Sequence, residues 1–187
     1  MKTILIAGLG NPGKKYEKTR HNSGFLFADY FFENFREEFK FSDWEEKKKI
    51  KSLVSAGKYG ENNIILAKPQ TFMNLSGEAL SAAKKYFIRG FTSNSLIVVH
   101  DEIDLPLGSF RISADSSSAG HKGVQNIIDI LGTKNFTRLR IGVDNRGDKE
   151  IATEKYVLGK FLPAELKLAN KVISESSEEI KQLISNS

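Results

Sequence analysis

Four polar residues stand where their side chains could act together on a carbonyl group. Asn11 lies in a Gly/Pro turn, His21 follows ten residues later, Asn74 lies in a second turn, and Asp101 follows an apolar run. An aspartate that accepts a hydrogen bond from one imidazole nitrogen leaves the other nitrogen basic, able to activate water. Asparagine amides donate hydrogen bonds without ionising, which suits a substrate carbonyl and its oxyanion. Because no G-x-S-x-G motif is present, water is the expected nucleophile.

Each of these residues also has a structural interpretation. Asn11 before Pro12 is a common turn residue, and Asn74 could cap a helix that begins near Ser76. His21 could be a packed histidine, and Asp101 could bond a backbone amide at a strand end. Spacing alone leaves both interpretations open.

The strands and turns around these residues would bring them to one edge of a sheet. The apolar run Lys2–Ala7 stops at the turn Gly8–Gly13, and the run Leu96–Val99 stops at His100 and Asp101. Strands that end this way deliver polar side chains to the carboxyl edge, where open α/β folds bind their ligands.

Helices and strands alternate along the rest of the chain. Apolar residues at helical spacing predict a first helix with Asn22 or Ser23 as its N-cap. Its apolar stripe would be Phe25, Ala28, Phe32, Phe35 and Phe39. Further helices are predicted over about 76–88 and 122–131 and from 163 onwards, and strands at 51–56, 63–68, 110–112 and 139–143, with 45–51 as a solvated connection. We expect one α/β domain over residues 1–187, with a mixed, twisted β-sheet surrounded by helices.

The turn Gly8–Gly13 resembles two phosphate-binding patterns and fits neither. It matches G-x-G-x-x-G, but Pro12 is a poor helix start, and a Phe-rich helix stands where a second strand should end in an acid. Extended to Lys15 it nearly matches G-x-x-x-x-G-K-[ST], but a lysine cannot coordinate magnesium. A nucleotide-dependent enzyme is therefore a minor alternative. In that case the added cofactor would stabilise the protein against unfolding.

Composition narrows the class of protein. The formal charge of +5 favours anionic partners, nucleic acid first among them. The absence of cysteine excludes thiol nucleophiles and thiolate metal sites, and no apolar run approaches the roughly 18 residues of a membrane span. His100, Asp101, Glu102 and Asp104 could be taken for a metal cluster, but neighbouring strand residues point to opposite faces. We expect no metal and no organic cofactor.

Six motifs in order give the chain a resemblance to a known family. They are Ile6–Gly13 with Tyr16, Thr19–Gly24, Lys68–Gly77, His100–Gly108, Arg138–Val143 and Tyr156–Phe161. Together they resemble bacterial-type peptidyl-tRNA hydrolase over almost the whole chain. The resemblance implies an esterase that cleaves the bond between a peptide and the 3′-terminal ribose of tRNA, acting in the cytoplasm as a monomer.

The resemblance also implies roles for individual residues. His21 matches the general base, Asp101 the residue that keeps it basic, and Asn11 the residue that distinguishes a blocked peptidyl amide from a free aminoacyl group. The residues expected to contact the acceptor end and its 3′-terminal adenosine are Tyr16, Phe72 and Asn74, with Met73 beside the peptide.

One region departs from the family pattern. The family commonly has a glycine-rich loop followed by Gly-His-Asn-Gly, whereas this chain has a Ser-rich loop at 115–119 and Lys122 in place of the asparagine. Serines lack the freedom of glycine to adopt positive φ, so we expect a stiffer or differently shaped loop. A lysine keeps a donor and adds a charge, so we expect Lys122 to contact a tRNA phosphate. Other basic residues expected to receive the acceptor stem are Arg111, Lys134, Arg138 and Arg140, the last two on one strand face.

The altered loop admits a second function. A catalytically impaired RNA-binding protein of the same fold would tolerate it, although the intact Asn11, His21 and Asp101 argue against that interpretation.

Overall fold

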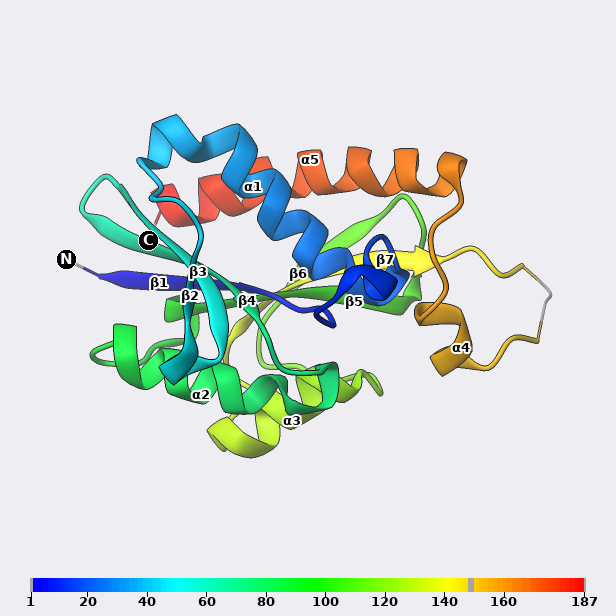
Figure 1. The fold of residues 1–187 in the computed structure, drawn as a ribbon, viewed down its shortest axis with the longest axis horizontal. Coiled ribbons are helices and arrows are strands. Elements are labelled where there is room, and N and C mark those ends of the chain that lie inside the picture. Colours follow the sequence, from blue (N-terminus) through cyan, green and yellow to red (C-terminus); the bar gives the residue numbers. More distant parts are fainter. Residues whose placement is uncertain (1, 148–149, 187) are drawn as a thin grey trace.

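The computed structural model describes residues 2–147 and 150–186, and within them the strands form a single mixed sheet (Figure 1). Its strand order is β2-β3-β4-β1-β5-β7-β6. The strands β4, β1, β5 and β7 are parallel neighbours, while β2, β3 and β6 pair antiparallel at the two edges. The strand bounds are β1 Thr3–Gly8, β2 Glu45–Lys47, β3 Ser52–Tyr59, β4 Asn62–Pro69, β5 Leu96–Pro106, β6 Phe110–Ser113 and β7 Thr137–Asp144.

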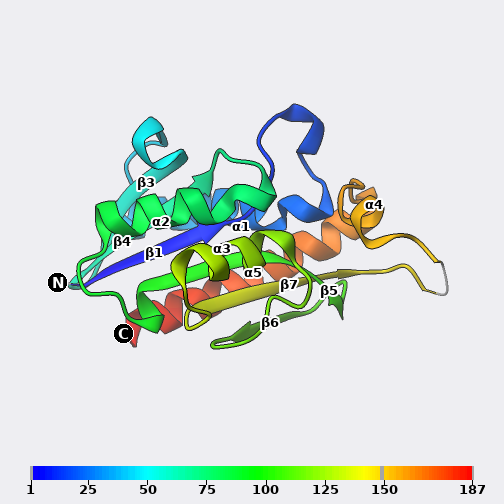
Figure 2. The ribbon, with the colours of Figure 1, turned by 90° about the horizontal axis from the view of Figure 1, so that it is seen from below.

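Helices cover both faces of this sheet. The helices α1 (Ser23–Phe39) and α5 (Pro163–Ser185) lie on one face, and α2 (Ser76–Phe87) and α3 (Lys122–Leu131) lie on the other. Figures 1 and 2 show the two helical layers with the sheet between them. A short helix, α4 (Thr153–Val157), stands apart beside the carboxyl ends of the central strands. The predicted α/β class and mixed sheet are confirmed.

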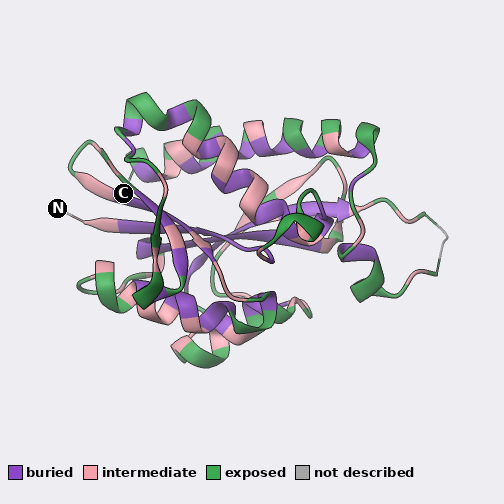
Figure 3. Cartoon of the chain, in the orientation of Figure 1, coloured by how far each residue is buried: buried purple, intermediate pink, exposed green. Residues whose placement is uncertain are grey.

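Burial follows these layers (Figure 3). Alternate residues of β1 pack to opposite sides: Ile4 and Ile6 against α1 and α5, Leu5 and Ala7 against α2 and α3. Such two-sided burial explains why the central strands are continuous apolar runs. No helix among the described residues combines the length and apolar character needed to cross a membrane.

The predicted stripe of α1 is wrong in part. Phe27 and Phe31 are fully buried, whereas Phe25 and Phe32 are only half-buried. Phe25 lies over the turn after β1, where its ring occupies the space that a Cβ at Gly10 would need. Phenylalanines also stand on either side of the buried face of α1. Their spacing alone therefore could not show which face of the helix packs against the sheet.

Two glycines let the first helix begin directly against the sheet. A Cβ on Gly8 would lie 2.1 Å from the Gly24 carbonyl oxygen, and one on Gly24 would lie 2.3 Å from the Val99 carbonyl oxygen. The Leu9 amide donates to Val99 (2.9 Å) and the Phe25 amide to Leu9 (3.2 Å). Gly8 and Gly10 of the turn that resembles a phosphate loop thus serve close packing against α1, and no α-helix starts within that turn.

Candidate active site

His21 and Asp101 meet at the carboxyl edge of the sheet, as the sequence predicts. His21 lies in the short 3₁₀ turn Arg20–Asn22, and its Nδ1 is 2.9 and 3.0 Å from the two Asp101 carboxylate oxygens. Asp101 extends from β5 and is almost wholly buried, which makes it a rigid partner. No group in residues 2–147 or 150–186 hydrogen-bonds His21 Nε2, which is thereby left as the basic nitrogen.

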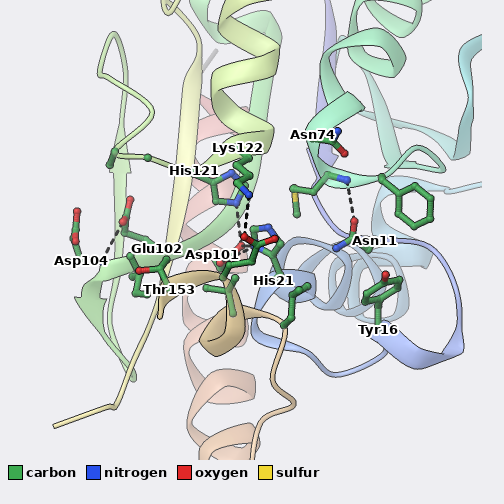
Figure 4. A pocket seen from close by; sticks show the side chains of 18 residues that line it. Asn11, Tyr16, His21, Asn74, Asp101, Glu102, Asp104, His121, Lys122 and Thr153 are labelled. Atoms are coloured by element: carbon green, nitrogen blue, oxygen red, sulfur yellow. Dashed lines mark hydrogen bonds and ion pairs between the residues drawn. The ribbon is translucent and has the colours of Figure 1, made fainter. Parts of the chain in front are cut away.

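His121 joins this pair, although no role was predicted for it from the sequence. Its Nε2 lies 3.0 Å from Asp101 Oδ1, and its Nδ1 accepts a hydrogen bond from the Val124 amide at 3.2 Å, capping α3. Because Nδ1 accepts, the proton of a neutral ring must be on Nε2, donated to Asp101. Figure 4 shows the His21 and His121 rings converging on Asp101. The signal was present: the motif Gly120–Gly123 departs from the family only at Lys122, and its histidine is one of three in the chain.

The three histidines of the chain lie close together, with the His121 ring in contact with the other two. The His121 ring centroid is 4.9 Å from that of His21 and 4.7 Å from that of His100. His100 is fully buried on the opposite face of β5 from Asp101, and its Nδ1 lies 2.6 Å from the Asp101 main-chain oxygen. Burial lowers the pKa of His100 to about 3, so this ring is neutral at physiological pH.

The charges around His21 favour its protonated form. Burial alone would lower its pKa, but the charge and hydrogen bonds of Asp101 outweigh burial and raise the pKa of His21. Lys122 lowers it and Glu154 raises it, each by a smaller effect. Burial would raise the pKa of Asp101, but His21 and His121 hold it well below its usual range. The carboxylate therefore stays ionised and can stabilise an imidazolium at His21.

Asn11 is held with its amide donor directed to the cavity. Its Oδ1 accepts from the Met73 amide (2.9 Å), so the NH₂ group remains as the free end. Its main chain is bound on both sides by Asn22, whose Oδ1 accepts from the Asn11 amide (2.9 Å) and whose Nδ2 donates to the Asn11 carbonyl (3.0 Å). Asn22 stands at the N-cap position of α1, as predicted, but its side chain does not cap the helix.

The other predicted contacts line the same cavity. Tyr16 and Phe72 meet edge to face with ring centroids 6.3 Å apart, and Phe72 is 52% exposed. Asn74 is exposed and does not cap α2, whose N-cap residue is Leu75. The cavity has a volume of about 870 Å³ and is lined by all eight predicted site residues: Asn11, Tyr16, His21, Phe72, Met73, Asn74, Asp101 and Lys122.

One wall of the cavity comes from a segment for which the sequence predicted neither a helix nor a role in the site. Helix α4 and the residue after it contribute Thr153, Glu154, Val157 and Leu158. Glu154 Oε2 lies 3.2 Å from Lys122 Nζ, so the two exposed side chains span the cavity between α4 and α3. Exposed pairs of this kind contribute little stability and exchange partners readily.

Two arginines expected to bind RNA are engaged inside the protein. Arg138 is 1% exposed and donates to the main-chain oxygens of Ser116, Ser117 and Lys134. Arg140 shares the strand face of Arg138, as predicted, but donates twice to Glu102, at 2.9 and 2.7 Å. The expectation that these two receive RNA is not supported. Arg111 and Lys134 are exposed, and Lys134 lies 3.9 Å from Asp115.

Among the described residues, the acids and histidines that could share a metal are His21, Asp101 and His121. The run His100–Asp104, already set aside on strand geometry, does not form such a group. A metal on His121 Nε2 would move the ring proton to Nδ1, which faces the Val124 N–H. Two N–H groups would then oppose each other. Glu102 is taken up by Arg140 and by the Asp104 amide. The hydrogen bonds of this cluster thus suit proton transfer rather than metal binding.

A histidine oriented by a carboxylate beside an amide donor suits water attack on a carbonyl, which places the chain among the hydrolases. Comparison with known proteins defines the class further. A family model described as peptidyl-tRNA hydrolase matches residues 5–187. The chain is 40% identical to a peptidyl-tRNA hydrolase of Thermodesulfovibrio yellowstonii, covering 97% of this chain and 92% of that protein. It is 43% identical to one of Aquifex aeolicus, covering 92% and 85%.

Solved structures agree. A crystal structure of peptidyl-tRNA hydrolase from Acinetobacter baumannii superposes with a TM-score of 0.85 at 30% identity, covering 98% of this chain and 89% of that one. The chain belongs to the peptidyl-tRNA hydrolase family. The resemblance stated from its motifs is therefore confirmed, and so is the prediction of an enzyme. Nothing in these comparisons favours the impaired RNA-binding alternative.

Proposed function

We propose that the chain hydrolyses peptidyl-tRNA, with His21 as the general base. Water held by His21 Nε2 attacks the ester carbonyl carbon that joins the peptide to the 3′-terminal ribose, and its proton passes to Nε2. Asp101, 2.9 Å from Nδ1, stabilises the imidazolium that forms. When the tetrahedral intermediate collapses, the C–O bond to the ribose breaks and His21 returns the proton to the leaving ribose oxygen. The products are a free peptide carboxyl group and free tRNA.

Asn11 supplies specificity for a blocked amino group. Its NH₂ group can donate to a peptide carbonyl, which a peptidyl ester has and a free aminoacyl ester lacks at that position. A free α-ammonium group offers only donors, so it would leave the Asn11 NH₂ unpaired beside a positive charge. The Met73 amide, 2.9 Å from Asn11 Oδ1, maintains this selectivity by preventing the side chain from turning its oxygen outward.

The aromatic rim receives the acceptor end. Tyr16 and the exposed Phe72 provide faces for stacking the 3′-terminal adenine, and Asn74 offers a free amide to its polar edge or ribose. Met73 is buried beneath this rim on the route to Asn11 and lies beside the peptide.

Lys122 contributes charge at the cavity mouth. When the tRNA enters, a phosphate replaces the Glu154 carboxylate as the partner of the Lys122 ammonium group. We place the enzyme in the cytoplasm, where its substrate arises during translation, and we expect it to act as a monomer, as the family resemblance implies.

The observation that carries this function is the contact of His21 Nδ1 with Asp101, while no residue that the structure describes bonds His21 Nε2. The test is hydrolysis of an N-acetyl-aminoacyl-tRNA beside the free aminoacyl-tRNA, by the wild-type enzyme and His21→Ala. We expect cleavage of the blocked substrate only, reduced at least about 10²-fold in His21→Ala. Thermal unfolding checks that the variant is folded. Equal activity of His21→Ala and the wild type would contradict the proposal, and so would a folded but inactive wild type. An inactive wild type that still binds tRNA would favour an RNA-binding protein.

A further inference from the structure

A buried arginine–glutamate pair lies directly behind the histidine turn. Arg20 precedes His21, is 7% exposed, and its Nη2 is 2.7 Å from Glu165 Oε2. Its Nη1 donates to the main-chain oxygens of Lys160 (3.2 Å) and Tyr156 (3.4 Å). The guanidinium carbon lies 4.2 Å from the Tyr156 ring centroid. Arginine is suited to such a site because its planar guanidinium group can donate several hydrogen bonds and stack on an aromatic ring at the same time.

Glu165 connects this arginine to both ends of the segment that carries α4. Its Oε1 accepts from Asn145 Nδ2 (3.2 Å), just after β7, and its Oε2 accepts from the Leu162 amide (2.8 Å), just before α5. Burial opposes ionisation of Glu165, but these hydrogen bonds and Arg20 hold its pKa below its usual value. Glu165 is therefore ionised at neutral pH and faces the Arg20 guanidinium as a carboxylate.

The main chain repeats the connection. The Arg20 amide donates to Gly159 (3.0 Å), the Phe161 amide donates to Lys18 (3.0 Å), and Thr19 forms a β-bridge with Lys160. Figure 1 shows the histidine turn, in dark blue, beside the orange link between α4 and α5. Residues 150–161 thus supply the α4 wall of the cavity and return to the residue next to His21.

We propose that Arg20 and Glu165 are positioning residues for hydrolysis: their ion pair holds His21 against Asp101 and fixes the α4 wall relative to His21. This inference rests on the proposed role of His21 as the base. A buried ion pair contributes little net stability, because desolvation offsets most of its attraction. Its directional bonds do fix geometry, and a misplacement of about 1 Å can cost up to 10²-fold in rate.

The test uses Glu165→Gln and Arg20→Lys in the full chain. Glu165→Gln keeps the shape and removes the charge, and Arg20→Lys keeps the charge and removes the fork and the stacking. The matched control is Ile184→Ala, which removes a fully buried side chain from the other end of α5 and destabilises the fold without touching the cavity. Each protein is compared at a temperature well below its own unfolding midpoint.

Two readouts are measured. The first is kcat and KM on N-acetyl-aminoacyl-tRNA, where we expect kcat to fall about tenfold in both positioning variants and to stay unchanged in Ile184→Ala. The second is the pKa of His21 from NMR titration of the chain's three histidines. The groups that face His21 are Asp101 from β5, His121 and Lys122 from α3, and Glu154 from α4. If His21 moves away from Asp101, its raised pKa falls toward the ordinary value.

Unchanged kcat and His21 pKa in the two variants would overturn the proposal, as would an equal loss of both in Ile184→Ala. If Arg20→Lys does not fold, the near-isosteric Glu165→Gln decides. The NMR readout does not require activity, so positioning is tested even if His21 proves not to be the base. An active His21→Ala enzyme would refute the proposed function without altering the titration result.

Discussion

At the scale of single residues, the orientation of the Asn11 amide depends on Asn22. The Asn22 side chain bonds both polar groups of the Asn11 main chain, at 2.9 and 3.0 Å, and all of these atoms are buried. Buried donors and acceptors that lose their partners cost about 1–3 kcal/mol each. Asn22 therefore stabilises the turn after β1 and sets the direction of the Asn11 donor.

We predict that Asn22→Ala lowers the free energy of unfolding by about 2–3 kcal/mol and weakens the selection of blocked over free aminoacyl-tRNA. The measurements are denaturant unfolding and the ratio of kcat/KM for the two substrates. Asn34→Ala is the control, because Asn34 is exposed on α1 and its side chain bonds the Tyr30 carbonyl alone among the residues that the structure describes. A selectivity ratio unchanged in Asn22→Ala would contradict this role.

Site residues that follow a visible strand end or turn could be predicted from the sequence. Residues that act by holding another residue in place could not. His21, Asp101 and Asn11 follow strands or turns whose ends are visible as Gly, Pro or polar residues. Asn22 reads as a helix cap, and no spacing shows that its side chain turns back to a residue eleven positions earlier. His121 is visible in the sequence only as part of the motif Gly120–Gly123, and its contact with Asp101, twenty residues earlier, is supplied by the fold.

At the scale of elements, the Ser-rich loop contains residues in the left-handed backbone conformation, and none of them is a serine. The residues with positive φ are Asp115, Ala119 and Gly120, at 47°, 48° and 79°. Arg138 holds the main chain of Ser116 and Ser117, and Ser118 Oγ donates to Gln125 (2.7 Å). The loop thus has a shape fixed by side-chain anchors, at the cost of a strained alanine next to the cavity.

We predict that Ala119→Gly raises the free energy of unfolding by about 0.5–1 kcal/mol, because glycine adopts φ near 48° without steric strain. Chemical denaturation measures the change. Ala114→Gly in the same loop is the control: Ala114 is exposed and does not have positive φ, so glycine there should destabilise by a similar amount. Destabilisation by both substitutions would show that Ala119 is not strained.

Periodicity predicted the long elements well and the short ones poorly. The helix expected over 122–131 is α3, and the predicted hairpin is the pair β3 and β4. The run 96–99 continues in the structure as β5 to Pro106, because its polar second half pairs with β7. The charged stretch 45–51 contains edge strand β2, and α4 is too short to show a period. Pairing partners far along the chain decide these cases.

At the scale of the whole molecule, a neutral buried histidine links the site to acid stability. The pKa of His100 falls to about 3 in the folded protein, against about 6.5 in an unfolded chain. Between these values the unfolded chain binds one more proton than the native one, so stability falls as the pH is lowered. The pKa of Asp101 is also lowered in the folded protein, so protonation of this carboxylate reduces the free energy of unfolding further only below about pH 4.

We predict that His100→Phe, which keeps a ring against His121, removes about one proton from the pH dependence of unfolding between pH 6.5 and 4.5. Urea unfolding at several pH values measures the slope for both proteins. Parallel slopes for wild type and variant would mean that His100 titrates normally in the native state.

Asp101 holds His21 in place as the general base and stabilises its protonated form, and the proposed function depends on this pair. This role of Asp101 is tested most directly by the pH profile of kcat/KM on N-acetyl-aminoacyl-tRNA for the wild type, Asp101→Asn and the exposed control Asp43→Asn. The base acts when deprotonated, so wild-type activity should rise with pH through a pKa above 6.5. In Asp101→Asn we predict a plateau about 10²–10⁴-fold lower and a limb moved to lower pH, with Asp43→Asn unchanged. A full plateau, or a limb that does not move in Asp101→Asn, would contradict the account.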